Sequence, residues 1–142
     1  MNSATGQEPT VLFVCNTNGG KSQLAAALLR QAAGGTVRVQ SAGLLPAHSI
    51  NELAASVAEE SGADMRSEVP TALTEQALRA ADRVIIVGEA RVPELEGVTM
   101  ERWVPNEAPA GLATDRERMV FLRDDLAARV AELNADLGTP PA

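Results

Sequence analysis

The stretch TVLFVCNTNGGKS, residues 10–22, is the part of the sequence that best indicates the fold of this chain. Residues 10–14 form a continuous apolar run of β-favouring side chains, which is typical of a strand buried within a parallel sheet. A glycine-containing loop follows, and residues 22–33 then have leucines and alanines at helical spacing up to Gly34. A buried strand, a glycine-containing loop and a helix in this order predict an anion-binding site at the start of the helix.

Beyond this stretch, the sequence predicts strands and helices in alternation. Short apolar runs indicate three more strands, at residues 37–40, 83–87 and 98–104. Helices are expected to begin at two capping-box patterns, residues 49–52 and 114–117, and a short helix is expected at residues 73–81. The last helix has an apolar stripe with a member at every third or fourth position: Met119, Leu122, Leu126, Val130, Leu133 and Leu137.

This alternation is typical of an α/β fold, because parallel strands need crossover connections that cover both faces of the sheet. We expect a single doubly wound domain over residues 10–137, with a four-stranded parallel sheet flanked by helices. Ligands in such folds bind beyond the carboxyl ends of the strands, where Cys15 lies. Residues 1–9 are polar and are expected to form a flexible lead-in, and residues 138–142 a flexible tail.

The composition argues against two classes of partner. The formal net charge is −7, whereas binding to a nucleic-acid backbone needs a basic surface, so no nucleic-acid partner is expected. No apolar run approaches the ~18 residues that span a bilayer, so no membrane association is expected either. The start of the chain lacks the basic and apolar regions of an export signal, and we therefore expect a cytoplasmic protein.

The loop after the first strand has the chemistry of an anion site. The first N–H groups of a helix lack carbonyl partners and have partial positive charge. Asn18, Gly19 and Gly20 can adopt backbone angles that turn further N–H groups inward. Lys21, the only lysine in the chain, adds a full positive charge. Ser22 is predicted to cap the helix and to donate its hydroxyl to the same pocket.

Cys15 is the only cysteine, and it stands at the start of this loop. A thiol at the end of an apolar strand can be a small buried core residue. A helix N-terminus beside a lysine, however, stabilises a thiolate, which is the nucleophilic form. The loop therefore favours Cys15 as a nucleophile. One cysteine excludes an intramolecular disulfide and a multi-cysteine zinc site, and no metal site is predicted.

A nucleotide-binding P-loop is the competing interpretation of this loop. The Walker pattern is G-x-x-x-x-G-K-[ST], and the chain has its second half in Gly20, Lys21 and Ser22. The position five residues before Gly20 is Cys15, where the pattern requires glycine. The strand at residues 83–87 is followed by Gly-Glu rather than by an aspartate that would hold magnesium. A nucleotide triphosphatase is therefore disfavoured.

The segment VLFVCNTNGGKSQLAAALL, residues 11–29, resembles the active-site loop of the low-molecular-weight tyrosine phosphatases and their arsenate reductase relatives. That family has the pattern C-x5-R-S at the start of its first helix, and this chain has C-x5-K-S. The segments SAG at residues 41–43 and ADRVI at residues 81–85 also agree with the family. The resemblance extends over about residues 10–137 and implies the family's fold. It implies an oxyanion bound by the loop residues Asn16, Thr17, Asn18, Gly19, Gly20, Lys21 and Ser22.

Two departures from the family pattern bear on the chemistry. Lys21 stands where the phosphatases have arginine, and lysine offers a point charge in place of a planar fork of donors. The spelling GGKSQ is similar to that of the arsenate–mycothiol transferase branch. The family also has an Asp-Pro pair in a late loop, whereas here Glu107 is separated from Pro109 by one residue. Glu107 is the candidate general acid, with a solvated loop glutamate as the alternative. The predicted catalytic residues are Cys15, Lys21, Ser22 and Glu107.

The resemblance implies arsenate detoxification by transfer of arsenate onto mycothiol. Because a single cysteine cannot form an internal disulfide, a low-molecular-weight thiol would have to enter the site. The resemblance implies that this co-substrate is mycothiol and that a separate redoxin later reduces the arseno-mycothiol product. No bound cofactor is expected. The alternatives are a phosphomonoesterase like the tyrosine phosphatases and a non-catalytic oxyanion-binding paralogue. The chain has no tyrosine and only two phenylalanines, Phe13 and Phe121, so no aromatic collar is expected around a phosphotyrosine ring.

Overall fold

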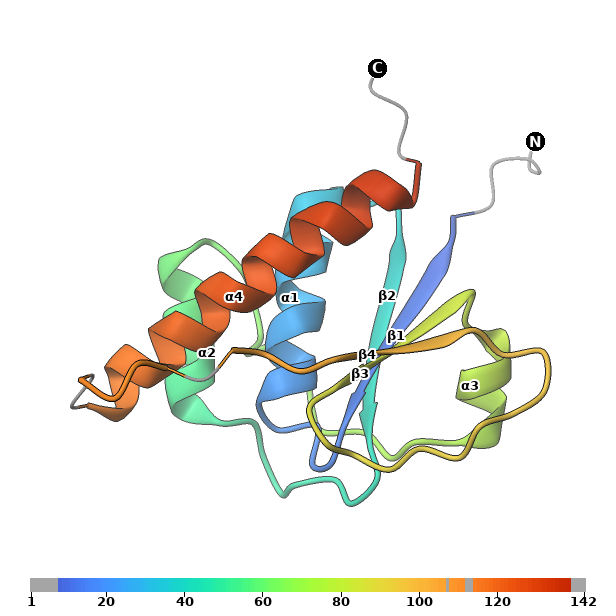
Figure 1. Ribbon diagram of the computed structural model, residues 1–142, viewed down its shortest axis with the longest axis horizontal. Helices are drawn as coiled ribbons and strands as arrows, with labels where there is room; N and C mark the ends of the chain where they lie inside the picture. Colours follow the sequence, from blue (N-terminus) through green and yellow to red (C-terminus); the bar gives the residue numbers. More distant parts are fainter. Residues whose placement is uncertain (1–7, 107, 112–113, 139–142) are drawn as a thin grey trace.

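Four parallel strands form one sheet at the centre of the computed structural model (Figure 1). The structure describes residues 8–106, 108–111 and 114–138, so most of the expected lead-in and tail lies outside it. Neighbouring strands are parallel in every pair, which confirms the predicted sheet. In spatial order the strands are β2 (Arg38–Gly43), β1 (Thr10–Cys15), β3 (Arg83–Val87) and β4 (Met100–Trp103).

Helices cover both faces of this sheet. Three of them, α1 (Lys21–Ala33), α2 (Glu52–Glu60) and α4 (Asp115–Asp136), pack together on one face (Figure 1). The short α3 (Glu75–Ala80) lies against the other face, where Leu78 is buried. This arrangement is the predicted doubly wound α/β fold.

Burial on both faces explains the continuous apolar run of β1. Side chains alternate along a strand, so Val11 and Phe13 join the core under α1 and α4, while Leu12 and Val14 join the core under α3. Each of the four is at most 1% exposed. Phe13 also packs against Trp103 of β4, with the ring centroids 5.6 Å apart. β1 is therefore the strand around which both cores are built.

The long helix α4 packs through the apolar stripe predicted from its sequence. The stripe consists of the buried Leu126, Val130 and Leu133 and the partly buried Met119, Leu122 and Leu137. At the start of the helix, Thr114 and Glu117 form the predicted capping box, in which each side chain accepts the main-chain N–H of the other residue. Both features of α4 are thus confirmed.

The capping box predicted before α2 is wrong. Asn51, not Ser49, caps the helix, and its side chain accepts the N–H of Ala54 at 2.9 Å. The main-chain N–H of Asn51 donates to the carbonyl of Gly19 at 2.7 Å. The start of α2 is therefore fixed by a contact with the loop after β1, which no local sequence pattern contains.

Two further elements have different bounds from those predicted. The helix expected at residues 73–81 begins only at Glu75, because Leu73 donates its N–H to the carbonyl of Gly43 at 2.9 Å and stays extended beside the end of β2. β4 is shorter than the strand expected at residues 98–104. In both places pairing with a neighbouring strand sets the boundary.

The strand order creates a switch point at the carboxyl end of β1. β2 lies on one side of β1 and β3 on the other, so the connections leaving β1 and β3 diverge there. Doubly wound folds bind their ligands at such a point. Cys15 is the last residue of β1 and lies at the predicted place.

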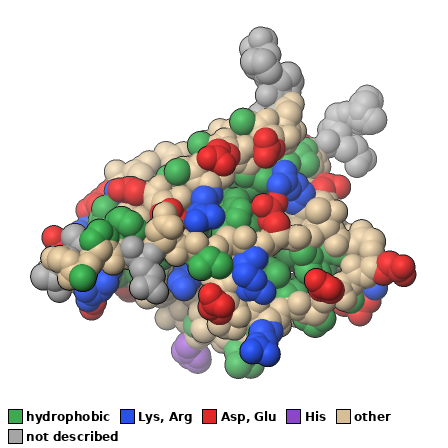
Figure 2. Space-filling model, viewed as in Figure 1, with side chains coloured by type: hydrophobic (Ala, Val, Ile, Leu, Met, Phe, Trp, Pro, Cys, Tyr) green, Lys and Arg blue, Asp and Glu red, His purple; other side chains and the backbone are tan. Residues whose placement is uncertain are grey.

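Charges on the described surface are mixed in sign. Figure 2 shows acidic and basic side chains interspersed on the face that displays α4 and β4. Some form ion pairs, as Arg129 does with Asp125 at 2.9 Å and Arg66 with Glu59 at 2.7 Å. Surface ion pairs contribute little to stability one by one, so the fold depends mainly on its core. Within the described ranges, no helix combines the length and apolarity needed to cross a bilayer.

We expect Leu126→Ala to lower the free energy of unfolding by about 2–5 kcal/mol, because it removes a fully buried side chain and leaves a cavity. Chemical denaturation followed by circular dichroism measures this change. Leu45→Ala is the control, because Leu45 is 79% exposed and its truncation should leave the unfolding free energy nearly unchanged. Equal losses in the two variants would contradict the place of Leu126 in the core.

Candidate functional site

The loop between β1 and α1 is anchored on one side by the segment that follows β2. Four of its carbonyls accept main-chain N–H groups from that segment: Cys15 from Leu44 at 3.3 Å, Asn16 from Leu45 at 2.8 Å, Thr17 from Ala47 at 2.8 Å and Gly19 from Asn51 at 2.7 Å. In a trans peptide the C=O and the following N–H point in opposite directions. These bonds therefore turn four N–H groups to the other side of the loop: those of Asn16, Thr17, Asn18 and Gly20.

That other side faces the sulfur of Cys15. Cys15 is only 6% exposed, and its Sγ accepts the main-chain N–H of Asn18 at 3.1 Å. The hydroxyl Oγ of Ser22 lies 3.0 Å from the same sulfur. Since this oxygen already accepts the Asn18 side-chain Nδ2 at 2.7 Å, its own hydrogen is available to the sulfur. The sulfur thus lies among hydrogen-bond donors at a helix N-terminus, an environment that stabilises a thiolate.

Asn18 shapes the loop through both its backbone and its side chain. Its φ of 52° is left-handed, a conformation that asparagine adopts more readily than most residues. Its side chain is fully buried, donates to Ser22 and accepts the main-chain N–H of Thr71 at 2.9 Å. The turn geometry predicted for Asn18 is therefore confirmed, and its side chain adds hydrogen bonds that hold the loop.

The helix cap predicted at Ser22 is wrong. α1 begins at Lys21, with Gly20 as its N-cap residue and no side-chain capping bond. Ser22 lies within the first turn, where its hydroxyl contacts Cys15. The hydroxyl of Ser22 therefore contacts the Cys15 sulfur and does not cap α1.

The glycine of the SAG segment, Gly43, is required by the close approach of β2 to the loop. β2 extends further than predicted and ends at Gly43, directly behind the loop. A Cβ atom at this position would lie 2.8 Å from the carbonyl carbon of Thr17 and 2.8 Å from the main-chain nitrogen of Asn18. Backbone atoms cannot move away cheaply, so this strand end admits only glycine.

Lys21 lies exposed at the start of α1 and extends across the end of β3. A Cβ atom at Gly88 would be 3.5 Å from its Nζ, which places the ammonium beside that backbone. Gly88 has a φ of 93°, a conformation suited to glycine, and so leaves room for the lysine. In the described ranges, no ion pair is found for Lys21. Its charge is therefore available to a ligand in the cavity below.

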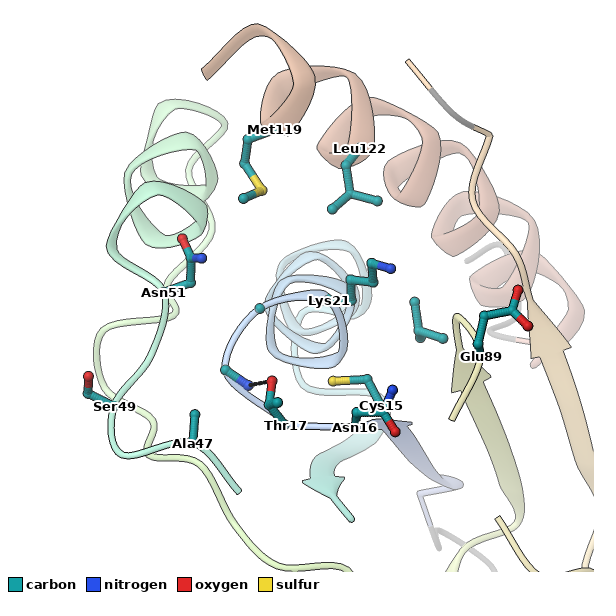
Figure 3. A pocket seen from close by; sticks show the side chains of 13 residues that line it. Cys15, Asn16, Thr17, Lys21, Ala47, Ser49, Asn51, Glu89, Met119 and Leu122 are labelled. Atoms are coloured by element: carbon teal, nitrogen blue, oxygen red, sulfur yellow. Dashed lines mark hydrogen bonds between the residues drawn. The ribbon is translucent and has the colours of Figure 1, made fainter. Parts of the chain in front are cut away.

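A cavity of about 440 Å³ opens over this loop (Figure 3). Its floor is formed by the predicted residues Cys15, Asn16, Thr17, Gly19, Gly20 and Lys21, whereas Asn18 and Ser22 are buried behind them. The walls come from three other segments and are formed by Ala47, Ser49, Asn51, Val87, Glu89, Met119 and Leu122. Figure 3 shows Met119 and Leu122 of α4 on the side of the cavity opposite the loop.

Sequence reasoning missed these wall residues. Glu89 could have been found, because it follows β3 at the same end of the sheet as Cys15, where ligands bind. Met119 and Leu122 were assigned only to the apolar stripe of α4, and they serve both the core and the cavity. Residues 47–51 have no local signal, since the hydrogen bonds to the loop place them there.

A second cavity, of about 450 Å³, adjoins the first and shares Lys21, Glu89 and Leu122 with it. It extends to Asn106 and Ala108. Glu107, the predicted general acid, lies between these two but outside the described residues. The loop on which Glu107 stands thus contributes to the walls beside the site.

This arrangement suits a tetrahedral oxyanion. Main-chain N–H groups, a helix N-terminus and the Lys21 ammonium converge above a buried sulfur. An anion held there would be in contact with the thiolate, and the same donors would stabilise charge that develops during attack. The site can therefore bind an oxyanion and attack it with Cys15.

We expect Cys15 to react with iodoacetamide rapidly at about pH 6, because donors stabilise its thiolate, and we expect arsenate or phosphate to slow the reaction. Mass spectrometry of quenched samples measures the rate. The urea-unfolded chain is the matched control, since it has the same single thiol without the loop and should react far more slowly at this pH. A folded protein that reacts only above about pH 8 and ignores oxyanions would exclude Cys15 as the nucleophile.

Comparison with known proteins agrees with this geometry. A structure of the thioredoxin-dependent arsenate reductase of Corynebacterium glutamicum is 32% identical with a TM-score of 0.76, and the match covers 93% of this chain but only 63% of that one. A structure described as an arsenate reductase in the phosphate binding state is 25% identical with a TM-score of 0.76, covering 91% of this chain and 98% of that one. The tyrosine phosphatase Wzb of Escherichia coli K30, solved with sulphate, is 19% identical with a TM-score of 0.75 over 93% of this chain and 100% of its own; it shares the fold.

The family model described as low molecular weight phosphotyrosine protein phosphatase matches residues 10–106, which include the loop, the sulfur and the ends of β1 and β3. This match covers more than half of the chain. The relatives that share the fold include structures holding phosphate or sulphate. The chain therefore belongs to the low molecular weight phosphotyrosine protein phosphatase family, a family of enzymes that act on oxyanions.

Proposed function

We propose that this protein transfers arsenate onto mycothiol. The Cys15 thiolate attacks arsenic, one arsenate oxygen leaves as water after protonation, and a bond forms between the Cys15 sulfur and arsenic. The thiolate of mycothiol then displaces Cys15 from arsenic, which gives arseno-mycothiol and frees the Cys15 thiolate. Arsenic stays pentavalent in both steps, so its reduction is left to a separate redoxin that acts on the released product.

The observation that supports this proposal is the isolation of Cys15. The 142-residue chain has one cysteine, so within this chain no second thiol can resolve the bond between sulfur and arsenic. The resolving thiol must therefore arrive from solution. The two adjoining cavities, of about 440 and 450 Å³, offer room beside the loop for a small thiol in addition to the oxyanion.

In this proposal, the loop residues have distinct tasks. The N–H groups on the inner side of the loop and Lys21 hold the arsenate oxygens, and Ser22 donates to the Cys15 sulfur. Glu107 is the candidate acid that protonates the leaving oxygen. No bound cofactor takes part, because mycothiol is consumed as a co-substrate.

One of the two arsenate reductases described above bears on the source of electrons. The Corynebacterium relative is a thioredoxin-dependent enzyme, and this chain matches only 63% of its length. A single cysteine favours a low-molecular-weight thiol over direct reduction of the protein by thioredoxin. The identity of the reductant is therefore the sharpest test of the proposal.

The composition of the walls favours a small inorganic substrate over a phosphotyrosine. The described residues around the Cys15 cavity include no aromatic side chain, although Phe121 lines the adjoining cavity. The walls of the Cys15 cavity are formed by alanine, valine, leucine and methionine side chains, by Ser49 and Asn51, and by the carboxylate of Glu89. A tyrosine ring would find no aromatic partner for stacking there. Arsenate needs only the loop.

We expect arsenate-dependent NADPH oxidation only when mycothiol and a mycothiol-specific redoxin system are both present. Thioredoxin with its reductase should be a poor substitute, because there is no protein disulfide for it to reduce. Cys15→Ser is the blank. If wild type gives no signal above this blank, yet hydrolyses an aryl phosphate without any thiol, the protein is a phosphomonoesterase. Equal turnover with thioredoxin alone would overturn the choice of mycothiol.

We expect Lys21→Ala to weaken arsenate binding by roughly 1.5–3 kcal/mol, the usual contribution of a charged hydrogen bond. Lys21→Arg should raise aryl phosphate hydrolysis, because the guanidinium presents two donors in one plane to the anion. Isothermal titration calorimetry and a chromogenic assay measure the two effects. Arg38→Ala is the matched control, since it removes the same charge at the amino end of β2, away from the loop. Unchanged arsenate affinity in Lys21→Ala would mean that the ammonium does not contact the ligand.

A further inference from the structure

Gln23 is a fully buried amide directly behind the active loop. It is the third residue of α1 and is 0% exposed. Its Nε2 donates to the side-chain Oδ1 of Asn18 at 3.3 Å and to the main-chain carbonyl of Val69 at 3.1 Å. Both hydrogens of one amide nitrogen are therefore used, one toward the loop and one toward the segment before α3.

The partners of this amide fix the orientation of the network. Thr71 can only donate its main-chain N–H, so the atom of Asn18 that it contacts must be the acceptor Oδ1. The carbonyl of Val69 can only accept, so the atom of Gln23 beside it must be Nε2. Turning either amide over would place donor against donor or acceptor against acceptor.

This orientation forms a chain of hydrogen bonds that ends on the sulfur. Gln23 Nε2 donates to Asn18 Oδ1, Asn18 Nδ2 donates to Ser22 Oγ at 2.7 Å, and Ser22 Oγ lies 3.0 Å from the Sγ of Cys15. Each bond polarises the next, so a donor at the far end strengthens the last bond. We propose that Gln23 is a positioning residue for the Cys15 nucleophile, acting through Asn18 and Ser22.

Gln23 supports Asn18 in a second way. By holding the carbonyl of Val69, it also fixes the segment whose Thr71 N–H is the other donor to Asn18 Oδ1. Gln23 thus supplies one donor to the Asn18 amide and, together with Gly43, helps to hold the segment that supplies the other. Asn18, whose main-chain N–H donates to the sulfur, is therefore held in part by Gln23, for which no hydrogen bond to the sulfur is found among the described residues.

Packing alone does not account for a glutamine at this position. Its Oε1 is buried and has no hydrogen-bond donor in the described part of the protein. Burying an unpaired carbonyl oxygen is unfavourable, whereas methionine would fill a similar volume with no polar atom to satisfy. What glutamine supplies and methionine does not is the pair of donors on Nε2.

This inference rests on Cys15 being the nucleophile of the proposed function, but not on the identity of the oxyanion or the thiol. Iodoacetamide alkylation tests it without arsenate or mycothiol. An unreactive wild-type Cys15 would count against the proposed function, whereas a reactive Cys15 that does not respond to Gln23 would overturn only this inference.

We expect Gln23→Met to slow alkylation of Cys15 at about pH 6 by about three- to tenfold, the factor that one neutral hydrogen bond provides. The rate at about pH 9, where a thiol ionises without help, should stay unchanged. Gln23→Leu, which removes both donors without adding a charge, should behave in the same way. Gln31→Met is the matched control, because Gln31 lies on the same helix, is exposed and donates to Ser61, and its loss should leave both rates unchanged. A folded Gln23→Met protein with the wild-type rate at both pH values would overturn the proposal.

A second measurement uses only the wild-type protein, in case the variants do not fold. In ¹⁵N-labelled protein, alkylation of Cys15 removes the thiolate at the end of the chain of hydrogen bonds. The side-chain amide resonances of Asn18 and Gln23 should then shift, while that of Gln31 should not. A Gln23 resonance that is unmoved by alkylation would show that no coupling reaches the sulfur, and the proposal would fail.

Discussion

The loop after β1 can attract an anion because its carbonyl groups are bound on its other side. Carbonyl oxygens have partial negative charge, and a loop that left them free would offer donors and acceptors together. Here four carbonyls are held by the segment that follows β2, so the opposite N–H groups turn to the other side of the loop, where that of Asn18 donates to the Cys15 sulfur. The end of β2 can lie close enough only because Gly43 has no side chain. The connection from β2 to α2 is therefore as much a part of the site as the loop itself.

Recognition of an anion by a chain of net charge −7 has to be local. At long range the protein repels anions, but that repulsion is screened beyond about 8 Å at physiological ionic strength. Within the cavity, the N–H groups, the end of α1 and Lys21 supply positive potential close to Cys15, although the carboxylate of Glu89 also lines the wall. The acidic surface and the anion site are compatible because they act over different distances.

The parts of this protein that were predictable from sequence are those with local causes. β1 is buried on both faces, and its sequence is therefore an unbroken run of apolar residues. α4 packs through one stripe, and its apolar residues therefore recur at every third or fourth position. The loop residues were found because glycines, a lysine and a cysteine stand together in sequence. Asn51 is also a favoured N-cap residue, but local rules alone did not choose it over Ser49, whereas the bond from its N–H to Gly19 fixes its place. The helix cap predicted at Ser22 was wrong because capping is a local rule, whereas the contact of its hydroxyl with Cys15 joins residues seven positions apart.

The bonds that hold Asn18 also have a consequence for the chemical durability of the protein. Asn18 is followed by Gly19, and in a mobile chain the glycine nitrogen of such a pair attacks the asparagine amide and releases ammonia. In this fold the Gly19 N–H is bonded to the Thr17 hydroxyl and the Asn18 amide is held by its neighbours, so the two reacting groups are kept apart. An aspartate at position 18 could only accept, and it would draw the Ser22 hydroxyl away from the sulfur. The folded protein therefore resists loss of the Asn18 amide, a group that the anion-binding loop needs. Each excursion to the unfolded state releases these bonds and makes the reaction possible.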